Sequence, residues 1–378
     1  MRRAAGVALT GGMLTFVALL FGAAPLLIPG VAFTLLGVLM PLWVTAGARG
    51  AGVRRRFDCD RVIEGEPVEA TIEVHSGRWG LPGGEVLDAL ADAPVSLPRR
   101  RSAAAAGALV EVRIVARAHR RGVRRLQAPS LVLGDALGLA RVTRAGGGGV
   151  QELLVLPRTE PVTWLARGGG TRLDRADARA RAELPAAAVD VDGLRPYRQG
   201  TPASRIHWSA LARGAGLLER QLRADGDTRP LVALDARCSG PSEELEAAVR
   251  AAASLALELA RTGGCRLLLG GERRAVAIEP ELASWPGAHA RLALVQGGPR
   301  ARAPVLGAGV TLGQLFYVAA GPLGRLPPAL TGAGGADWVL VLPAPLRPAA
   351  PASACFEVAD CRGYALRARS RWAGAPAL

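Results

Sequence analysis

The sequence predicts a multidomain α+β protein with an N-terminal transmembrane helical hairpin, a β-sandwich domain and an α/β domain. Three observations predict this class. Residues 4 to 48 carry no charged side chain. Between residues 54 and 162, apolar and polar residues alternate in short segments, as in half-buried strands. From residue 229 onward, apolar strands and an amphipathic helix follow one another in the order of a parallel sheet covered by helices.

The hairpin is expected in residues 1–50. One membrane-spanning helix needs about 20 apolar residues, so the uncharged stretch has room for two. We predict helices over residues 5 to 24 and 26 to 46, with the turn near Pro25, Pro29 and Gly30. A cleaved signal peptide is the alternative, but the apolar core of such a peptide is much shorter than this stretch.

Arginines flank the predicted hairpin at both ends, whereas its expected turn carries no charge. They are Arg2, Arg3, Arg49, Arg54, Arg55 and Arg56. The positive-inside rule then places both ends in the cytoplasm. We therefore expect a two-pass protein of the inner, cytoplasmic membrane with cytoplasmic soluble domains. The five cysteines are widely spread and form no C-x-x-C pair, which fits free thiols in a reducing compartment.

The β domain is expected in residues 54–162. Val68, Ala70, Ile72 and Val74 alternate with polar residues, and the segment "ALVEVRIVARA" repeats this pattern. Further short apolar runs, separated by Gly, Pro and Asp, favour an antiparallel sandwich of immunoglobulin-like architecture. The small, charged and aperiodic residues 163–191 predict a flexible connection to the next segment.

Residues 192–228 hold an unusual concentration of arginine and aromatic side chains, which marks a candidate interaction motif. Thr201 and Pro202 are typical of a helix start, and Gly214 is typical of its end. Trp208 and Leu211 share one face of this short helix, so we expect Trp208 to be packed. The candidate interaction residues are Arg195, Tyr197, Gly200, Arg205, His207, Trp208, Arg213 and Glu219.

Residues 229–378 are expected to form the α/β domain. The run "PLVALDA" is typical of a buried parallel strand whose carboxyl end, at Asp235, meets solvent. A helix follows, opened by Ser242 and ended by Gly263 and Gly264, and "CRLLLGG" forms a second strand. This strand, helix and strand order predicts a doubly wound sheet.

The order of unlike residues in the motif closely resembles that of the bacterial DUF58 family. The matching residues are Asp192, Gly193, Leu194, Arg195, Tyr197, Gly200, Arg205, Ile206, Trp208, Ala212 and Arg213. The segments "EGEPV", "RRGV", "GDALGL" and "LLVLPRTEPV" look like further family landmarks, so the resemblance covers nearly the whole chain. Thr201 departs from it, because the family usually has Asp there.

The resemblance implies a fold and a partner. Residues 229–378 are expected to form a von Willebrand factor A-like domain. The family resemblance also implies work with a MoxR-type AAA+ ATPase in the assembly or maturation of protein complexes.

A divalent cation is the cofactor that such a fold often holds, through Asp-x-Ser-x-Ser after its first strand. In this sequence Asp235 and Ser239 are the remaining candidate ligands for Mg²⁺, which prefers hard oxygen atoms. Arg237 places a cation where an oxygen ligand belongs. We therefore predict no cofactor, and we keep a divalent-metal-dependent ligand-binding or hydrolytic domain as the alternative function.

Catalysis and nucleic-acid binding are both disfavoured. His207, Ser209 and Asp235 could be named as a triad, but Ser209 lies two residues from His207 and points to another side of the helix. No G-x-S-x-G, Walker loop or H-E-x-x-H is present. The net charge of +15 arises from a chain without lysine and with only 4% aromatic residues, which points to compositional bias rather than phosphate binding.

The favoured hypothesis is therefore a membrane-tethered adaptor that is not an enzyme and that binds a protein partner. Arg, Tyr and Trp are the residue types that dominate binding hot spots. The alternative is an internal clamp, in which the same residues hold the β domain on the α/β domain, with Arg195 or Arg213 paired to Glu219 or Asp225.

Overall fold

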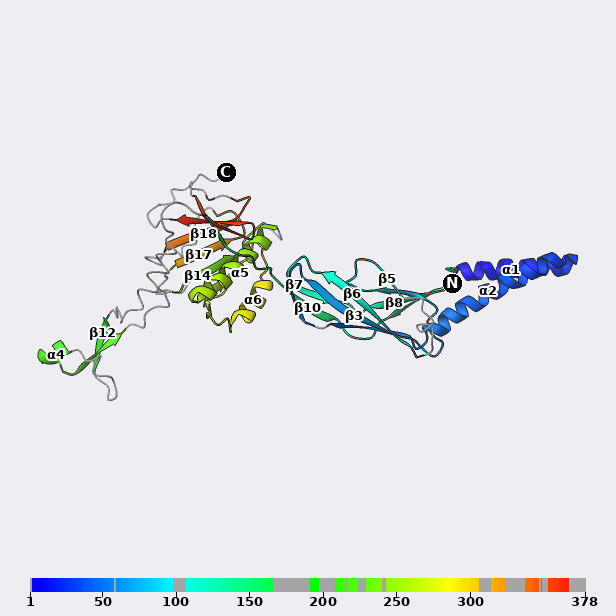
Figure 1. Cartoon of the computed structure of the whole chain (residues 1–378), viewed down its shortest axis with the longest axis horizontal. Helices are drawn as coiled ribbons and strands as arrows, with labels where there is room; N and C mark the ends of the chain where they lie inside the picture. The colour runs from blue at the N-terminus through cyan, green and yellow to red at the C-terminus, as the bar shows by residue number, and fades with distance from the viewer. Residues whose placement is uncertain are drawn as a thin grey trace. The chain divides into compact units, whose positions relative to one another are not determined.

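The computed structural model describes residues 2–57, 59–97, 107–165, 191–196, 208–214, 216–222, 229–239, 243–305, 314–323, 337–346, 348 and 353–366. The chain divides into a first unit, Met1–Leu156, and a second unit, Pro157–Leu378 (Figure 1). The first contains two apolar helices and three small sheets, and the second contains a mixed sheet with helices. The predicted α+β class is confirmed at this level.

The two N-terminal helices are α1, Arg2–Phe21, and α2, Ala24–Ala48. Their connection lies at Gly22 and Ala23, so the predicted turn near Pro25, Pro29 and Gly30 was wrong. Gly22 has a φ of +65°, a left-handed conformation that commonly ends a helix. Pro25 lies in the first turn of α2, where its missing N–H has no helical partner to lose.

The helices pack on each other through small residues. The buried residues of α1 are Ala4, Gly11 and Ala18. Gly30 and Gly37 are the buried residues of α2 that face α1. A Cβ atom on Gly30 would lie only 2.6 Å from Thr15 Oγ1, so the backbones approach closely, as in membrane helix pairs. The outer faces are apolar and exposed, and both helices are long and apolar enough to cross a bilayer.

Three sheets form the rest of the first unit. Their strands lie in the orders β1–β3–β6, β2–β10–β7 and β5–β4–β8–β9. The bounds are β1 Gly52–Phe57, β2 Arg61–Ile63, β3 Pro67–His75, β4 Gly84–Leu87, β5 Val95–Ser96, β6 Leu109–Arg117, β7 Gly122–Leu126, β8 Ser130–Gly134, β9 Arg141–Ala145 and β10 Gln151–Leu156. Every pairing is antiparallel except that of β2 with β10.

The β1–β3–β6 sheet contributes to both cores of this unit. The predicted alternation on β3 is confirmed, because Val68, Ala70, Ile72 and Val74 are buried between more exposed neighbours. Ile72 and Val74 share a core with residues of β4 and β8, whereas Val68 and Ala70 share one with residues of β2, β7 and β10. This alternation buries one face of the sheet against the other two sheets of the unit.

The end of α2 belongs to the β core. Val44 and Ala48 are buried in the same cluster as Val53 of β1 and Leu131 of β8. The last turn of the second helix is therefore fixed to the sheets by apolar contacts rather than by a free linker.

Arg55 is buried at the centre of the first unit. Its Nη1 atom lies 2.8 Å from Asp88 Oδ2, and the two side chains are 1% and 0% exposed. Its Nε donates to Gln151 Oε1 at 3.0 Å, and Nη2 donates to the carbonyl oxygens of Leu126 and Gln127. Arg55 thus ties β1 to β7 and β10 of a second sheet, and to Asp88, which follows β4 of the third. It cannot contribute to the positive flank of the hairpin that the sequence predicts.

The second unit is built on an eight-stranded sheet in the order β11–β19–β20–β18–β17–β14–β15–β16. The bounds are β11 Thr163–Trp164, β14 Leu231–Asp235, β15 Cys265–Leu269, β16 Val276–Ile278, β17 Gln314–Ala319, β18 Asp337–Pro343, β19 Ala354–Val358 and β20 Cys361–Leu366. Strands β15, β14, β17 and β18 are parallel neighbours, and the outer strands join antiparallel. β11, which opens the predicted flexible connection, therefore belongs to this sheet.

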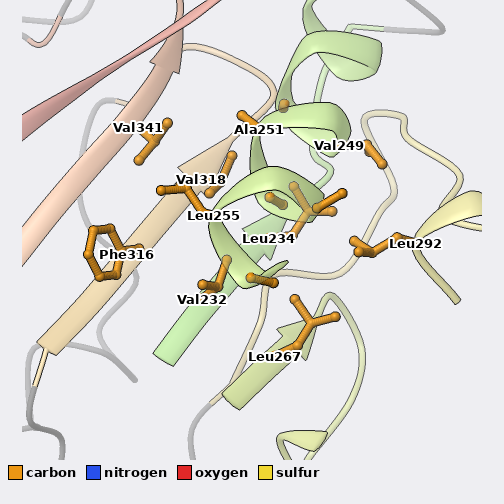
Figure 2. Close-up of a cluster of buried hydrophobic side chains, with 14 of the residues drawn as sticks. Val232, Leu234, Val249, Ala251, Leu255, Leu267, Leu292, Phe316, Val318 and Val341 are labelled. Carbon is orange, nitrogen blue, oxygen red and sulfur yellow. The ribbon is translucent and has the colours of Figure 1, made fainter. Parts of the chain in front are cut away.

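Helix α5, Glu243–Gly263, covers one face of the parallel strands. Figure 2 shows Leu255 of α5 among Val232, Phe316 and Val318, which come from β14 and β17. Helix α6, Trp285–Ala293, adds Leu292 to the same cluster. The predicted strand, helix and strand order around β14 and β15 is present.

Candidate interaction site

The central motif forms a small element of its own. β12, Val191–Pro196, pairs antiparallel with β13, Leu218–Leu222, and the short helix α4, Trp208–Ala212, lies between them in the chain. The register places Arg195 opposite Glu219. Residues at such positions are cross-strand neighbours, so the backbone brings two of the eight predicted residues together.

Trp208 is 58% exposed and Leu211 is 40% exposed, so the prediction that Trp208 is packed was wrong. The helical spacing showed which side chains share a face, but spacing does not say whether another element covers that face. Arg213 is also exposed. Tyr197, Gly200, Arg205 and His207 lie outside the described residues, and so does the predicted partner Asp225.

Asp235 ends β14 at the carboxyl edge of the sheet. The next strand along the chain, β15, lies on one side of β14, and β17 lies on its other side. The strand order therefore changes direction here, and such a switch point is where doubly wound sheets commonly bind ligands. Asp235 is nevertheless only 2% exposed.

The Asp235 carboxylate is fully engaged by its own chain. The hydroxyl of Tyr317, on β17, donates to Oδ2 at 2.5 Å. Arg237 donates from Nη2 to Oδ2 at 2.6 Å, from Nε to Oδ1 at 3.0 Å, and from its backbone N–H to Oδ1 at 3.1 Å. Both carboxylate oxygens therefore already have a cation or hydroxyl donor.

The pKa shifts of the neighbours follow from this arrangement. Burial, and then the hydrogen bond to Asp235, raises the pKa of Tyr317 above its usual value. The hydrogen bond to Asp235 also raises the pKa of Arg237. Tyr317 stays protonated and Arg237 stays charged. The charge of the Asp235 carboxylate is therefore balanced by Arg237, and the three side chains form a structural contact.

Asp235 and Ser239 do not fit a magnesium site. The Arg237 guanidinium lies against the carboxylate that the metal would need, and Ser239 is exposed on the following loop. Within the described ranges, no group of three or more His, Cys, Asp or Glu side chains is placed to hold a metal ion. The sequence analysis did not identify Tyr317 as a partner of Asp235, because a single hydroxyl within an apolar strand is its only signal.

The cysteines are not in disulfides, but their surroundings differ. Cys265 and Cys361 are buried, and burial raises the pKa of each thiol to about 12. A thiol is nucleophilic as its thiolate, so these two are unsuited to nucleophilic catalysis. Cys59 is exposed.

His289 is a buried histidine in the second unit that is held in its neutral form. It is 6% exposed, its ring stacks on Trp285, and its Nε2 lies 2.8 Å from the carbonyl oxygen of Pro157. Burial lowers its pKa below the usual 6.5, against a smaller opposing effect of the Pro157 carbonyl. The segment that enters the second unit is therefore fastened to α6 by a group that resists protonation.

We expect the stability of the second unit to fall as the pH drops below about 6.5, because the unfolded state then takes up a proton that folded His289 resists. Unfolding midpoints of the full chain between about pH 7 and 5 measure this. His289→Gln, which cannot titrate, should flatten the dependence, whereas His75→Gln at an exposed position should not. An unchanged slope in His289→Gln would contradict the prediction.

No protein-family model matches this chain, and no curated protein matches it in sequence.

Proposed function

We propose that this chain is a membrane-tethered adaptor that binds a protein partner through the surface around α4. One observation carries the proposal. Trp208 and Leu211 are exposed on α4, and Arg213, which directly follows this helix, is exposed too. Apolar side chains that are exposed next to one another mark interaction surfaces, and Trp and Arg are preferred anchors in them.

The tether is the α1–α2 hairpin, which we place in the inner membrane with the soluble units in the cytoplasm. Its outward side chains are apolar, as lipid contact requires. Arg2, Arg3 and Arg49 stand at the end where α1 begins and α2 ends, and exposed Arg54 follows on β1. Without Arg55, the positive charge still favours a cytoplasmic position for this end.

The fold families belong to the same proposal. A first unit in which one sheet faces two others supports an immunoglobulin-like sandwich. A parallel core with Asp235 at a switch point supports a von Willebrand factor A-like domain whose metal-binding role has been replaced by Arg237. The DUF58 relationship, and with it a MoxR-type AAA+ ATPase as the partner, is supported by the order of the motif residues and by the further segments that resemble the family.

Photo-crosslinking in intact membranes from a group placed beside residue 208, followed by mass spectrometry, tests the proposal. We expect wild type to capture one dominant partner, an AAA+ ATPase of the MoxR type. Trp208→Ala should weaken capture by about thirtyfold, the effect of losing a hot-spot residue of about 2 kcal/mol. Leu294→Ala removes an apolar side chain that is 52% exposed elsewhere in the same unit and should capture normally.

Two further variants separate docking from the internal clamp. Arg205→Lys keeps the charge but loses bidentate geometry, so it should reduce capture while the unfolding midpoint stays unchanged. Normal capture by both Trp208→Ala and Arg205→Lys, or a lowered unfolding midpoint with capture intact, would favour the clamp. A carboxyl-terminal reporter that is active outside the cytoplasm would contradict the proposed orientation.

A further inference from the structure

The first unit contains a cavity of about 910 Å³ where the start of α1 meets the sheets. Arg2 and Arg3 contribute to its wall from α1, Pro82 and Glu85 from the region of β4, and Arg141 from β9. Figure 1 shows the N-terminal end of α1 near β5 and β8. The volume is in the range of small-molecule and headgroup sites.

The cavity has free cationic donors. Asp135, also in its wall, accepts backbone N–H bonds from Leu137, Leu139 and Ala140 at 2.6 to 3.2 Å, so both of its carboxylate oxygens already have donors although the group keeps its negative charge. Glu85 pairs with Arg141 at 3.4 Å. Arg2 and Arg3 have no ion pair with any residue that the structure describes, so their guanidinium groups can bind an anion.

The position of the cavity corresponds to the edge of a bilayer. Residues 24 to 43 of α2, which precede its buried end, span about 30 Å at 1.5 Å per residue, the thickness of the hydrocarbon core. Gly47 packs against the loop of residues 77–82, where a Cβ atom would meet Pro82 Cδ at 2.8 Å. Pro82 therefore places one wall of the cavity directly beside the end of the membrane span.

Trp79 marks the same level independently. It is 66% exposed and lies on this loop beside exposed Arg78. An exposed indole is costly in water, whereas tryptophan is enriched where lipid headgroups meet the hydrocarbon core. Trp79 and the free arginines thus assign the loop and the cavity mouth to the headgroup layer.

We propose that this cavity binds the phosphate headgroup of an anionic phospholipid from the leaflet at which the hairpin ends. Arg2 and Arg3 would donate to the phosphate oxygens, and Arg141 would shift from Glu85 toward the lipid. A membrane lipid is favoured over free phosphate because the cavity lies beside the span, where acyl chains can lie along α1. The inference rests on the membrane tether of the proposed function and not on its protein partner.

Native mass spectrometry of the full chain, released from nanodiscs of equal parts phosphatidylcholine and phosphatidylglycerol, tests this. We expect wild type to retain phosphatidylglycerol selectively. Arg3→Gln and Arg141→Gln should each lower its retention about fivefold, the effect of one cation near a membrane surface. Arg144→Gln removes the same charge from β9 outside the cavity wall and should retain the lipid as wild type does.

Equal retention of both lipids, or an equal loss in Arg144→Gln, would overturn the assignment. So would inorganic phosphate that displaces phosphatidylglycerol at millimolar concentration, because that would show a site for free phosphate. Arg141→Lys keeps the charge and should retain the lipid even if Arg141→Gln folds poorly. Partner capture should remain normal in Arg3→Gln and Arg141→Gln, so failure here is distinct from failure of the adaptor proposal.

Discussion

Replacement of Asp88 by Ala should lower the free energy of unfolding of the first unit by about 3–5 kcal/mol, because it leaves a buried guanidinium without its counter-charge. Arg55 and Asp88 have side chains that are only 1% and 0% exposed, so water cannot substitute for the lost carboxylate. The remaining acceptors of Arg55 are neutral. Urea unfolding of the full chain in detergent, followed by hydrogen exchange of β1 and β7 amides, measures the effect.

A surface ion pair of the same sheet provides the control. Arg56 pairs with Glu73 at 2.8 Å, but the arginine side chain is 73% exposed. Glu73→Ala should therefore cost no more than about 1 kcal/mol. The double variant Arg55→Met with Asp88→Leu removes both charges and should recover most of the loss. Similar unfolding energies for Asp88→Ala and Glu73→Ala would show that the buried pair is not the central contact.

Arg55 also shows why the sequence alone was misleading at this point. As a sequence pattern, three consecutive arginines, Arg54 to Arg56, predict one basic flank. Alternation along β1 separates them, because Val53 and Arg55 point to the buried side while Arg54 and Arg56 are exposed. The alternation with a period of two is visible in the sequence, but the buried acceptor Asp88 comes from the segment after β4, a strand of another sheet. Its proximity depends on tertiary packing that no local pattern encodes.

Elements with a repeated pattern were predictable. The alternation on β3 and the uncharged stretch of α1 and α2 each involve many residues that favour the same secondary structure. Together these residues predict the type of element correctly. The turn of the hairpin depends on one or two residues. The sequence prediction placed it at Pro25 and Pro29, which both lie within α2, rather than at Gly22. Boundaries set by single residues are thus less predictable than the elements that they join.

The candidate site was predictable only where its residues are close in sequence. The backbone register that places Arg195 opposite Glu219 follows from the pairing of β12 with β13, and it agrees with one of the pairs that the sequence left open. The contact of Asp235 with Tyr317 joins residues 82 positions apart. It requires β17 to lie beside β14 although β15 and β16 come between them in the chain. Strand order of this kind is set by the packing of the whole sheet.

Replacement of Asp235 by Ala should lower the free energy of unfolding of the second unit by about 3 kcal/mol. An unsatisfied buried donor costs about 1–3 kcal/mol, and the Tyr317 hydroxyl, on a side chain only 1% exposed, would lose its acceptor. Arg237 adds less, because its side chain is 43% exposed and water can solvate it. Chemical unfolding of the full chain, followed by hydrogen exchange of β14 and β17 amides, measures the loss.

Wild type and Asp235→Ala also test whether Arg237 is the cation that balances the charge of Asp235. Glu357→Ala breaks an exposed pair with Arg362 in the same unit and should cost no more than about 1 kcal/mol. Magnesium should leave the unfolding midpoint of wild type unchanged, because a guanidinium already lies on both carboxylate oxygens. If magnesium raised the midpoint of wild type but not that of Asp235→Ala, the carboxylate would still be open to a metal ion. In that case Arg237 would be a displaceable neighbour, and Asp235 would be available as a metal ligand.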